Sequence, residues 1–238
     1  MLKVMQNILY VILVIVVSSE TLKAETLWNF AYGANMDRST LKSRKVTPIQ
    51  AVPAKIKDWT LRFNLIGIPW FEPAFGNVEY QTGAVVHGVA YELTPEDFKR
   101  LREIEGGGGY EGEGYDVIDL TVETYNHKKI SAKVFTAVSK WKHESLPSQR
   151  YLNLLIRGAT ENHLNESYIR TVLAKQNAFQ GNWAQKGVLC LFVAPIYVPA
   201  WLAQKVCHQF GWSTLWYQRF LLDLAKFLWS IHGDVGKA

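Results

Sequence analysis

Apolar and polar residues alternate along three stretches of the chain, which is the pattern of strands with one buried face, and a fourth stretch, residues 84–93, is apolar and β-branched. In residues 54–63, for example, Trp59, Leu61 and Phe63 alternate with polar neighbours. The four predicted strands are residues 54–63, 84–93, 115–122 and 130–138. Because several strands of this length have few helices between them, the pattern favours an α+β fold with a small, mostly antiparallel sheet or barrel over a doubly wound parallel sheet.

Helical signals predict three helices that flank these strands. The first follows Thr94, a favourable N-cap residue, and has a proline at its first position. The other two are predicted at residues 148–159 and 166–174. Earlier in the chain, residues 30–36 predict a strand that runs through a glycine turn into the N-terminus of a helix.

The C-terminal part of the chain is more apolar. Residues 187–206 are almost entirely apolar, but Pro195 and Pro199 disfavour one straight transmembrane helix. Residues 213–231 have the periodicity of a broad-faced amphipathic helix that contains several tryptophans. Two alternatives fit the region 187–231 equally: contact with a membrane surface, or packing against the rest of the protein or a partner subunit.

The N-terminal residues are typical of a targeting segment. Lys3 precedes the apolar run 8–17, and small residues follow at Ser18 and Ser19. Residues 1–24 therefore predict a signal peptide or an uncleaved signal anchor. This places the protein in the secretory pathway, secreted or membrane-associated; without such a signal, the expected location is cytoplasmic.

Length and composition fit one folded domain with an extension at each end. Of the 238 residues, 48% are hydrophobic, which is enough for a sizeable core. The predicted division is a targeting segment at 1–24, a mixed α+β domain at 25–180 and an apolar, tryptophan-rich helical extension at 181–238. The formal net charge of +5 is modest and its basic residues are scattered, which disfavours binding to nucleic acid.

The cysteines and histidines do not indicate a metal site. Cys190 and Cys207 could form one disulfide or remain two buried thiols. The six histidines have no metal-ligand spacing with each other or with the cysteines. We therefore expect no zinc site.

Two features could carry chemistry, and the first is the turn Tyr32-Gly33-Ala34-Asn35. A strand-to-helix turn of this kind can point several backbone N–H groups at one spot and hold an anion. The alternative is a turn that only connects the two elements, with Asn35 as a helix cap.

The second feature is Glu105. Phe98, Leu101 and Glu105 share one face of the predicted helix, so the carboxylate is expected in an apolar setting, where it is costly unless paired or protonated. Such a group is a candidate for proton transfer, and the alternative is an exposed residue at a frayed helix end. The glycine run 106–109 could be a lid over a substrate or a plain connection, and it lacks the Lys-Ser/Thr ending of a P-loop.

These residues, in this order, resemble the γ-glutamylcyclotransferase family. The family's Tyr-Gly-Ser-Asn loop is similar to Tyr32-Gly33-Ala34-Asn35, and its strand after a basic-aromatic entry is similar to residues 54–63. Its catalytic glutamate, followed by glycine, falls on Glu105-Gly106, and the tyrosine that opens its next strand falls on Tyr115. Its later helix pair is similar to residues 151–159 and 161–164, so the resemblance extends over about residues 27 to 175.

The resemblance implies a small mixed barrel with flanking helices, no cofactor, and release of 5-oxoproline from a small γ-glutamyl substrate together with a free amine or amino acid. It implies Glu105 as the catalytic acid and base, and a substrate-binding group of Tyr32, Gly33, Ala34, Asn35, Tyr115 and Phe135. Two positions depart from the family: Ala34 replaces the usual serine, and Phe135 stands where some relatives have a tyrosine.

Two alternatives are consistent with the same residues. One is a cyclotransferase that acts on a γ-glutamylamine or on a specialised metabolite. The other is a catalytically weak, membrane-associated binding module on the same scaffold, suggested by Ala34, Phe135 and the apolar C-terminal region.

Overall fold

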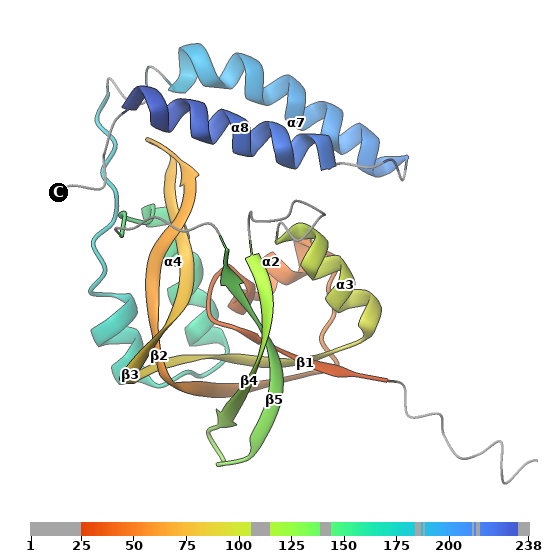
Figure 1. Ribbon diagram of the computed structural model, residues 1–238, viewed down its shortest axis with the longest axis vertical. Helices are drawn as coiled ribbons and strands as arrows, with labels where there is room; N and C mark the ends of the chain where they lie inside the picture. Colours follow the sequence, from red (N-terminus) through yellow and green to blue (C-terminus); the bar gives the residue numbers. More distant parts are fainter. Residues whose placement is uncertain are drawn as a thin grey trace, which may run out of the picture.

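Five strands close into a barrel in the computed structural model of the chain, in the order β1-β3-β2-β4-β5 (Figure 1). β1 runs parallel to β5, and all other neighbours are antiparallel. The strands are β1 (Leu27–Ala31), β2 (Gln50–Ile68), β3 (Glu72–Leu93), β4 (Tyr115–Thr124) and β5 (Lys129–Ala137). The predicted α+β fold with a small, mostly antiparallel barrel is confirmed. The structure describes residues 25–105, 115–138, 144–183, 187, 189–210, 212 and 215–232.

Helices surround the barrel at the predicted places. They are η1 (Ala34–Met36), α2 (Arg38–Ser43), α3 (Pro95–Ile104), α4 (Gln149–Glu161), α5 (Glu166–Tyr168), η2 (Ile169–Leu173), η3 (Leu189–Val193), α7 (Ala194–Gln209) and α8 (Leu215–His232). Thr94 caps α3 as predicted, because its Oγ1 accepts a hydrogen bond from the Asp97 N–H at 3.2 Å. The helix predicted at 166–174 is split, since α5 continues into the π-helical turn η2.

The hairpin of β2 and β3 is much longer than the strands predicted there. Its pairing runs from Gln50–Glu92 to Ile68–Glu72, with irregular register at residues 57–59 and 62–65. Such bulges bend a hairpin and increase its twist. In Figure 1 the far half of the hairpin rises away from the barrel.

The core lies inside the barrel and between the barrel and α4. Its largest fully buried side chains are Phe30, Met36, Ile56, Leu93, Leu101, Leu155, Leu173, Val78, Val86, Val89, Val122 and Val134. α4 lies so close to the segment after β1 that a Cβ at Gly158 would stand 2.5 Å from the backbone nitrogen of Asp37. Glycine at position 158 therefore lets α4 fix the position of that segment.

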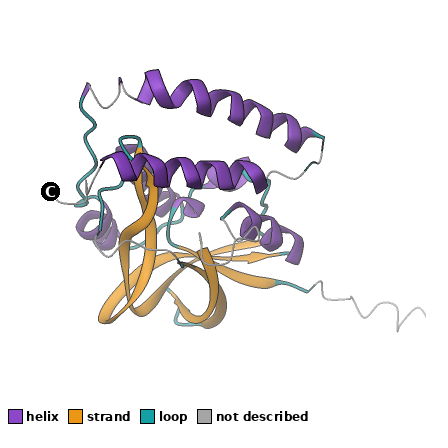
Figure 2. Ribbon diagram, turned by 45° about the horizontal axis from the view of Figure 1, so that its top comes forward, coloured by secondary structure: helices purple, strands orange, loops and turns teal. Residues whose placement is uncertain are grey.

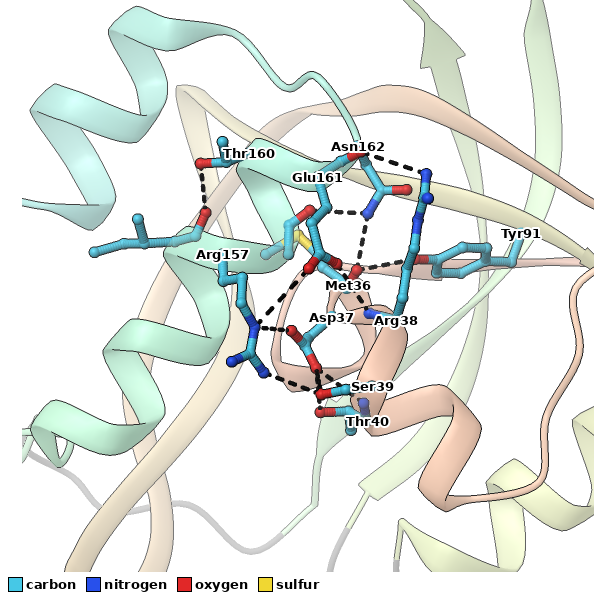
Figure 3. A network of polar contacts seen from close by, with 12 residues as sticks. Met36, Asp37, Arg38, Ser39, Thr40, Tyr91, Arg157, Thr160, Glu161 and Asn162 are labelled. Atoms are coloured by element: carbon cyan, nitrogen blue, oxygen red, sulfur yellow. Dashed lines mark hydrogen bonds and ion pairs between the residues drawn. The ribbon is translucent and has the colours of Figure 1, made fainter.

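A buried polar network also holds this segment in place (Figure 3). Asp37 is fully buried and caps α2, and its Oδ2 accepts a hydrogen bond from Arg157 Nε on α4 at 2.5 Å. The Met36 carbonyl accepts from Asn162 Nδ2 at 2.8 Å and from the Tyr91 hydroxyl at 3.1 Å. The backbone that follows β1 is thus anchored to α4 and β3 at two consecutive residues.

Replacing Asp37 with asparagine is expected to lower the free energy of unfolding by about 1–3 kcal/mol at neutral pH, because a charged cap and a charge-assisted bond are lost. Burial by itself raises the pKa of Asp37, but hydrogen bonds from Arg157 and Ser39 outweigh it, so the pKa lies well below its ordinary value. Such a carboxyl stabilises the fold above its unfolded pKa, so the difference between the two proteins should shrink below about pH 4.

Urea unfolding of both proteins as a function of pH measures this effect. Asp119→Asn is the matched control, because it removes an exposed ion pair with Lys133 and should cost at most about 0.5 kcal/mol. Equal losses in the two variants would contradict the role given to Asp37.

The two C-terminal helices form a hairpin beside the strands (Figures 1 and 2). α8 packs against β2 and against α7. The tilted rings of Tyr197 and Tyr217 contact each other across the hairpin, with their centroids 6.5 Å apart. The sequence pattern predicted that the prolines would interrupt this segment, but α7 runs through both. Pro195 lies in its first turn, where a missing N–H costs least, and Pro199 lies inside the helix. None of the described helices is both long and apolar enough to cross a membrane. Contact of residues 187–231 with a membrane surface stays a prediction.

Other sequence-based expectations concern the ends and the cysteines. The predicted signal at 1–24 and the glycine run 106–109 lie outside the described residues. Cys190 is exposed, Cys207 is half-buried and both are free thiols, so the structure has neither the disulfide nor two buried thiols. They lie near opposite ends of a helical segment, ~25 Å apart at 1.5 Å per residue, which is too far for a disulfide.

Candidate active site

The structure brings Glu105 to the loop that follows β1. Glu105 caps the C-terminus of α3, and its N–H donates to the Leu101 carbonyl at 3.0 Å. Its Oε1 accepts a hydrogen bond from Asn35 Nδ2 at 2.7 Å. The carboxylate also forms an ion pair with Arg44, at the end of α2, and the Glu105 side chain is only 15% exposed. The two features that the sequence singled out are therefore in direct contact.

The surroundings of Glu105 are not purely apolar. Its side chain is mostly buried, and its carboxylate is paired with polar groups. The charged and amide groups of Arg44 and Asn35 pair with the carboxylate. Phe98 takes a different place, because its ring stacks on Phe135 with the centroids 5.9 Å apart.

Arg44 links the loop to the acid. Its Nη1 donates to Asn35 Oδ1 at 2.5 Å and to the Glu105 carboxylate. Sequence analysis missed Arg44 because it is one of several basic residues around the end of α2, and only the tertiary fold brings α3 beside it. Arg44 places a permanent positive charge beside the loop.

The helix N-terminus predicted after Gly33 is a single 3-10 turn. Residues 34–36 form η1, and α2 begins only at Arg38, with Asp37 as its cap. A helix macrodipole needs several aligned turns, so one short turn contributes little to anion binding. The sequence pattern predicted that a helix dipole would give the loop a positive potential. In the structure the charge of Arg44 supplies that potential.

Three tyrosines lie at or near the loop: Tyr32 and Tyr151 are buried and Tyr115 is half-buried. Burial raises the pKa of all three phenols, and the negative charge of Glu105 adds to the effect. They therefore remain neutral and keep a proton to donate. The Tyr32 hydroxyl donates to the Phe135 carbonyl at 2.6 Å, and the Tyr115 hydroxyl donates to the Gly76 carbonyl at 2.5 Å.

Tyr151, on α4, was not predicted as a site residue. Its hydroxyl accepts from the Gly76 N–H at 3.1 Å, and a Cβ on Gly33 would lie 3.0 Å from the same oxygen. Gly33 and Gly76 thus make room for the Tyr151 hydroxyl. One feature of the sequence could have indicated it. Tyr151 is on the buried face of the helix predicted at 148–159, and a buried phenol hydroxyl needs a polar partner.

Tyr151→Phe is expected to lower kcat/KM about tenfold while costing only about 1 kcal/mol of stability, the usual value of one hydrogen bond. Tyr125→Phe is the control, because that hydroxyl also accepts a backbone N–H, from Asn165 at 2.9 Å, away from the loop; it has a further hydrogen bond with His87 Nδ1 at 2.6 Å. Steady-state kinetics and urea unfolding should show a stability loss at least as large, but unchanged activity, in the control. Unchanged activity in both variants would exclude Tyr151 from the site.

Phe135 and Ala34 are the two departures from the family pattern. Phe135 is buried between Phe98 and the edge-on ring of Tyr115, at 6.4 Å, so its side chain forms an apolar wall. Ala34 opens the 3-10 turn, and its carbonyl accepts from the Asp37 N–H at 3.1 Å. In the part of the chain that the structure describes, no group of three or more His, Cys, Asp or Glu side chains could hold a metal ion.

Comparisons with known proteins agree with this geometry. The AIG2-like family matches residues 85–172. The γ-glutamyl cyclotransferase gliK of Claviceps purpurea is 32% identical over 217 residues, which cover 82% of this chain and 94% of that protein. The chain belongs to the γ-glutamylcyclotransferase family.

Further relatives extend the comparison. The γ-glutamyl cyclotransferase gliK of Aspergillus fumigatus is 26% identical over 238 residues, covering 88% of this chain and 86% of that protein. A solved structure of a γ-glutamyl cyclotransferase has a TM-score of 0.57 and 22% identity, covering 69% of this chain and 98% of that one, which shows a shared fold. As a member of the γ-glutamylcyclotransferase family, this chain is a cyclotransferase enzyme.

Proposed function

We propose that residues 25–180 cyclise a small γ-glutamyl substrate by attack of its α-amine on its own γ-carbonyl carbon, releasing 5-oxoproline and a free amine or amino acid. The observation that carries this proposal is the contact between the Glu105 carboxylate and Asn35 on the loop after β1. It places one proton-carrying group beside one candidate anion-binding loop. An intramolecular reaction needs little more, because the fold only has to orient one substrate and move its protons.

In the proposed reaction Glu105 acts first as a base. It takes one proton from the substrate's α-ammonium, and the free amine then attacks the γ-carbonyl carbon to close a five-membered ring. As the amide C–N bond breaks, Glu105 returns that proton to the leaving nitrogen. The ring nitrogen loses a second proton, which the leaving amine also gains at neutral pH, so the reaction consumes no water.

Charge complementarity orients the substrate in this scheme. The α-carboxylate is placed against the backbone N–H groups of Gly33, Ala34 and Asn35 and against Arg44. Two hydrogens of Arg44 Nη1 contact Asn35 and Glu105, and a guanidinium carries three further N–H donors. Arg44 would then hold the carboxylate of the substrate and the acid of the enzyme at once.

Neutral tyrosines suit the remaining task, which is to stabilise the oxyanion that forms on the γ-carbonyl oxygen. Because burial raises the pKa of Tyr151, its hydroxyl remains a donor throughout the reaction. Tyr32 and Tyr115 hold the walls of the site through their bonds to the Phe135 and Gly76 carbonyls.

The test is release of 5-oxoproline by the full-length protein from glutathione, γ-glutamyl dipeptides and γ-glutamylamines, measured by chromatography. We expect release from at least one of these classes, and none from the matching glutaryl amides, which lack the attacking amine. Release of glutamate in place of 5-oxoproline would contradict the cyclisation. A folded protein that releases no 5-oxoproline from any of these compounds would contradict the proposal for these substrate classes.

A further inference from the structure

The hairpin of α7 and α8, called here the C-terminal hairpin, has a large exposed apolar surface. Val198, Leu202, Val206 and Phe210 follow each other at intervals of four residues and therefore form one stripe along α7 and the turn after it. All four are exposed, Phe210 by 66%. Contiguous apolar surface of this kind marks an interaction site in soluble proteins.

The stripe is separate from the side chains that attach the hairpin to the rest of the molecule. Tyr217 and Leu228 of α8 are buried, and Tyr217 contacts Tyr197 of α7 and Phe220. α8 also packs against β2. The hairpin thus has its own packed side, and further aromatic residues continue the exposed surface: Trp201, Trp212, Trp216 and Phe227.

The C-terminal hairpin has a net positive charge. Residues 194–232 contain Lys205, Arg219 and Lys226 and a single acidic residue, Asp223, which gives a formal net charge of +2. The preceding residues 167–193 contain no aspartate or glutamate. This charge balance favours a negatively charged partner surface.

The position of Lys205 distinguishes a lipid surface from a protein partner. Lys205 lies beside the stripe, with its Nζ 3.9 Å from the centre of the Trp201 ring. In the dry centre of a protein interface an ammonium is costly, and lysine is depleted there. At a bilayer surface the lysine stem can follow the apolar side chains while the ammonium reaches the phosphates, and tryptophan is favoured at the same depth.

We propose that the C-terminal hairpin docks this enzyme on an anionic phospholipid surface. α7 lies in the plane of the interface, with its stripe inserted ~5–10 Å between the headgroups. Lys205, Arg219 and Lys226 of the hairpin attract the surface electrostatically. The proposal concerns a surface remote in sequence from Glu105 and does not depend on the chemistry proposed for it.

The experiment is co-sedimentation of the full-length protein with vesicles of phosphatidylcholine alone or of phosphatidylcholine with phosphatidylserine, at low and high salt. We expect binding to the anionic vesicles that salt weakens. Trp201→Ser/Leu202→Ser should lower the apparent affinity about tenfold or more. Ile49→Ser/Val85→Ser removes two apolar side chains of similar exposure on the barrel and should bind like the parent. All three proteins are expected to turn over a soluble γ-glutamyl substrate equally.

Two results would overturn the proposal. One is the absence of binding to anionic vesicles, or binding that both double variants share with the parent. The other is self-association of the parent in light scattering that Trp201→Ser/Leu202→Ser abolishes, without vesicle binding, which would assign the stripe to a second copy of the chain. Because turnover of the soluble substrate is measured separately, loss of vesicle binding is distinguishable from failure of the proposed reaction.

Discussion

Glu105→Gln should lower kcat by about 100- to 10,000-fold, the range typical of a lost general acid–base. Glutamine has the same shape, and its carbonyl oxygen can still accept the hydrogen bonds from Asn35 and Arg44. The loop should therefore keep its structure, and substrate should still bind. What the variant loses is the ability to take a proton from the substrate and return it. The measurements are 5-oxoproline release for turnover and calorimetry for substrate binding.

Glu123→Gln is the matched control for that experiment. Glu123 is also a carboxylate in contact with cations, since Lys57 and Lys55 lower its pKa to about 2, but it lies on β4. Its replacement should leave turnover unchanged. If Glu105→Gln retained activity within tenfold of the parent while folded, the proton carrier would have to be another group.

Arg44→Ala should raise KM by about 10- to 100-fold, because a charge-assisted hydrogen bond to the substrate's α-carboxylate is worth roughly 1.5–3 kcal/mol. It should also lower kcat, because the Glu105 carboxylate loses one of its two partners. Arg44→Lys restores the positive charge but not the planar, forked set of N–H donors, so we expect a partial recovery of KM and kcat. Added guanidinium should recover part of the activity of Arg44→Ala.

A substrate without the α-carboxylate separates binding from a purely structural role. If Arg44 holds that carboxylate, the corresponding 4-aminobutyryl amide should lose little further in KM when Arg44 is replaced. Equal losses for both substrates would mean that Arg44 only supports the loop. Lys42→Ala, on the same helix, controls for a general loss of positive charge and should behave like the parent.

The fold was predictable where one face of a strand is buried and the other is not. Alternation identified residues 54–63, and an apolar, β-branched run identified residues 84–93 as the strand that pairs with them in the long hairpin. Residues 72–83 were not predicted as part of a strand because their apolar and polar positions do not alternate. Nearly all of 72–78 is buried on both faces of the strand, and 80–83 is exposed on both. A period of two carries information only at the boundary between core and solvent.

The candidate site was predictable only in part. Glu105 and the loop 32–35 were singled out from spacing and from the family resemblance, and the fold places them in contact. Arg44 and Tyr151 were not, because Arg44 meets Glu105 across 61 residues of the chain and Tyr151 meets Gly76 across 75. No local pattern distinguishes one arginine at a helix end from its basic neighbours, so only the tertiary structure identifies it.

The surroundings of Gly76 limit how parts of this enzyme can be recombined with those of its relatives. Both polar groups of this peptide unit bind tyrosine hydroxyls, its N–H that of Tyr151 and its carbonyl that of Tyr115. A Cβ at position 76 would stand 3.1 Å from the first of these oxygens. Chimeras that replace α4 alone should therefore keep both hydrogen bonds of this peptide unit only if the donor helix also brings a tyrosine to position 151. Donors with another residue there would have to contribute β3 and the loop after β1 as well, so these three segments are expected to be inherited as one block.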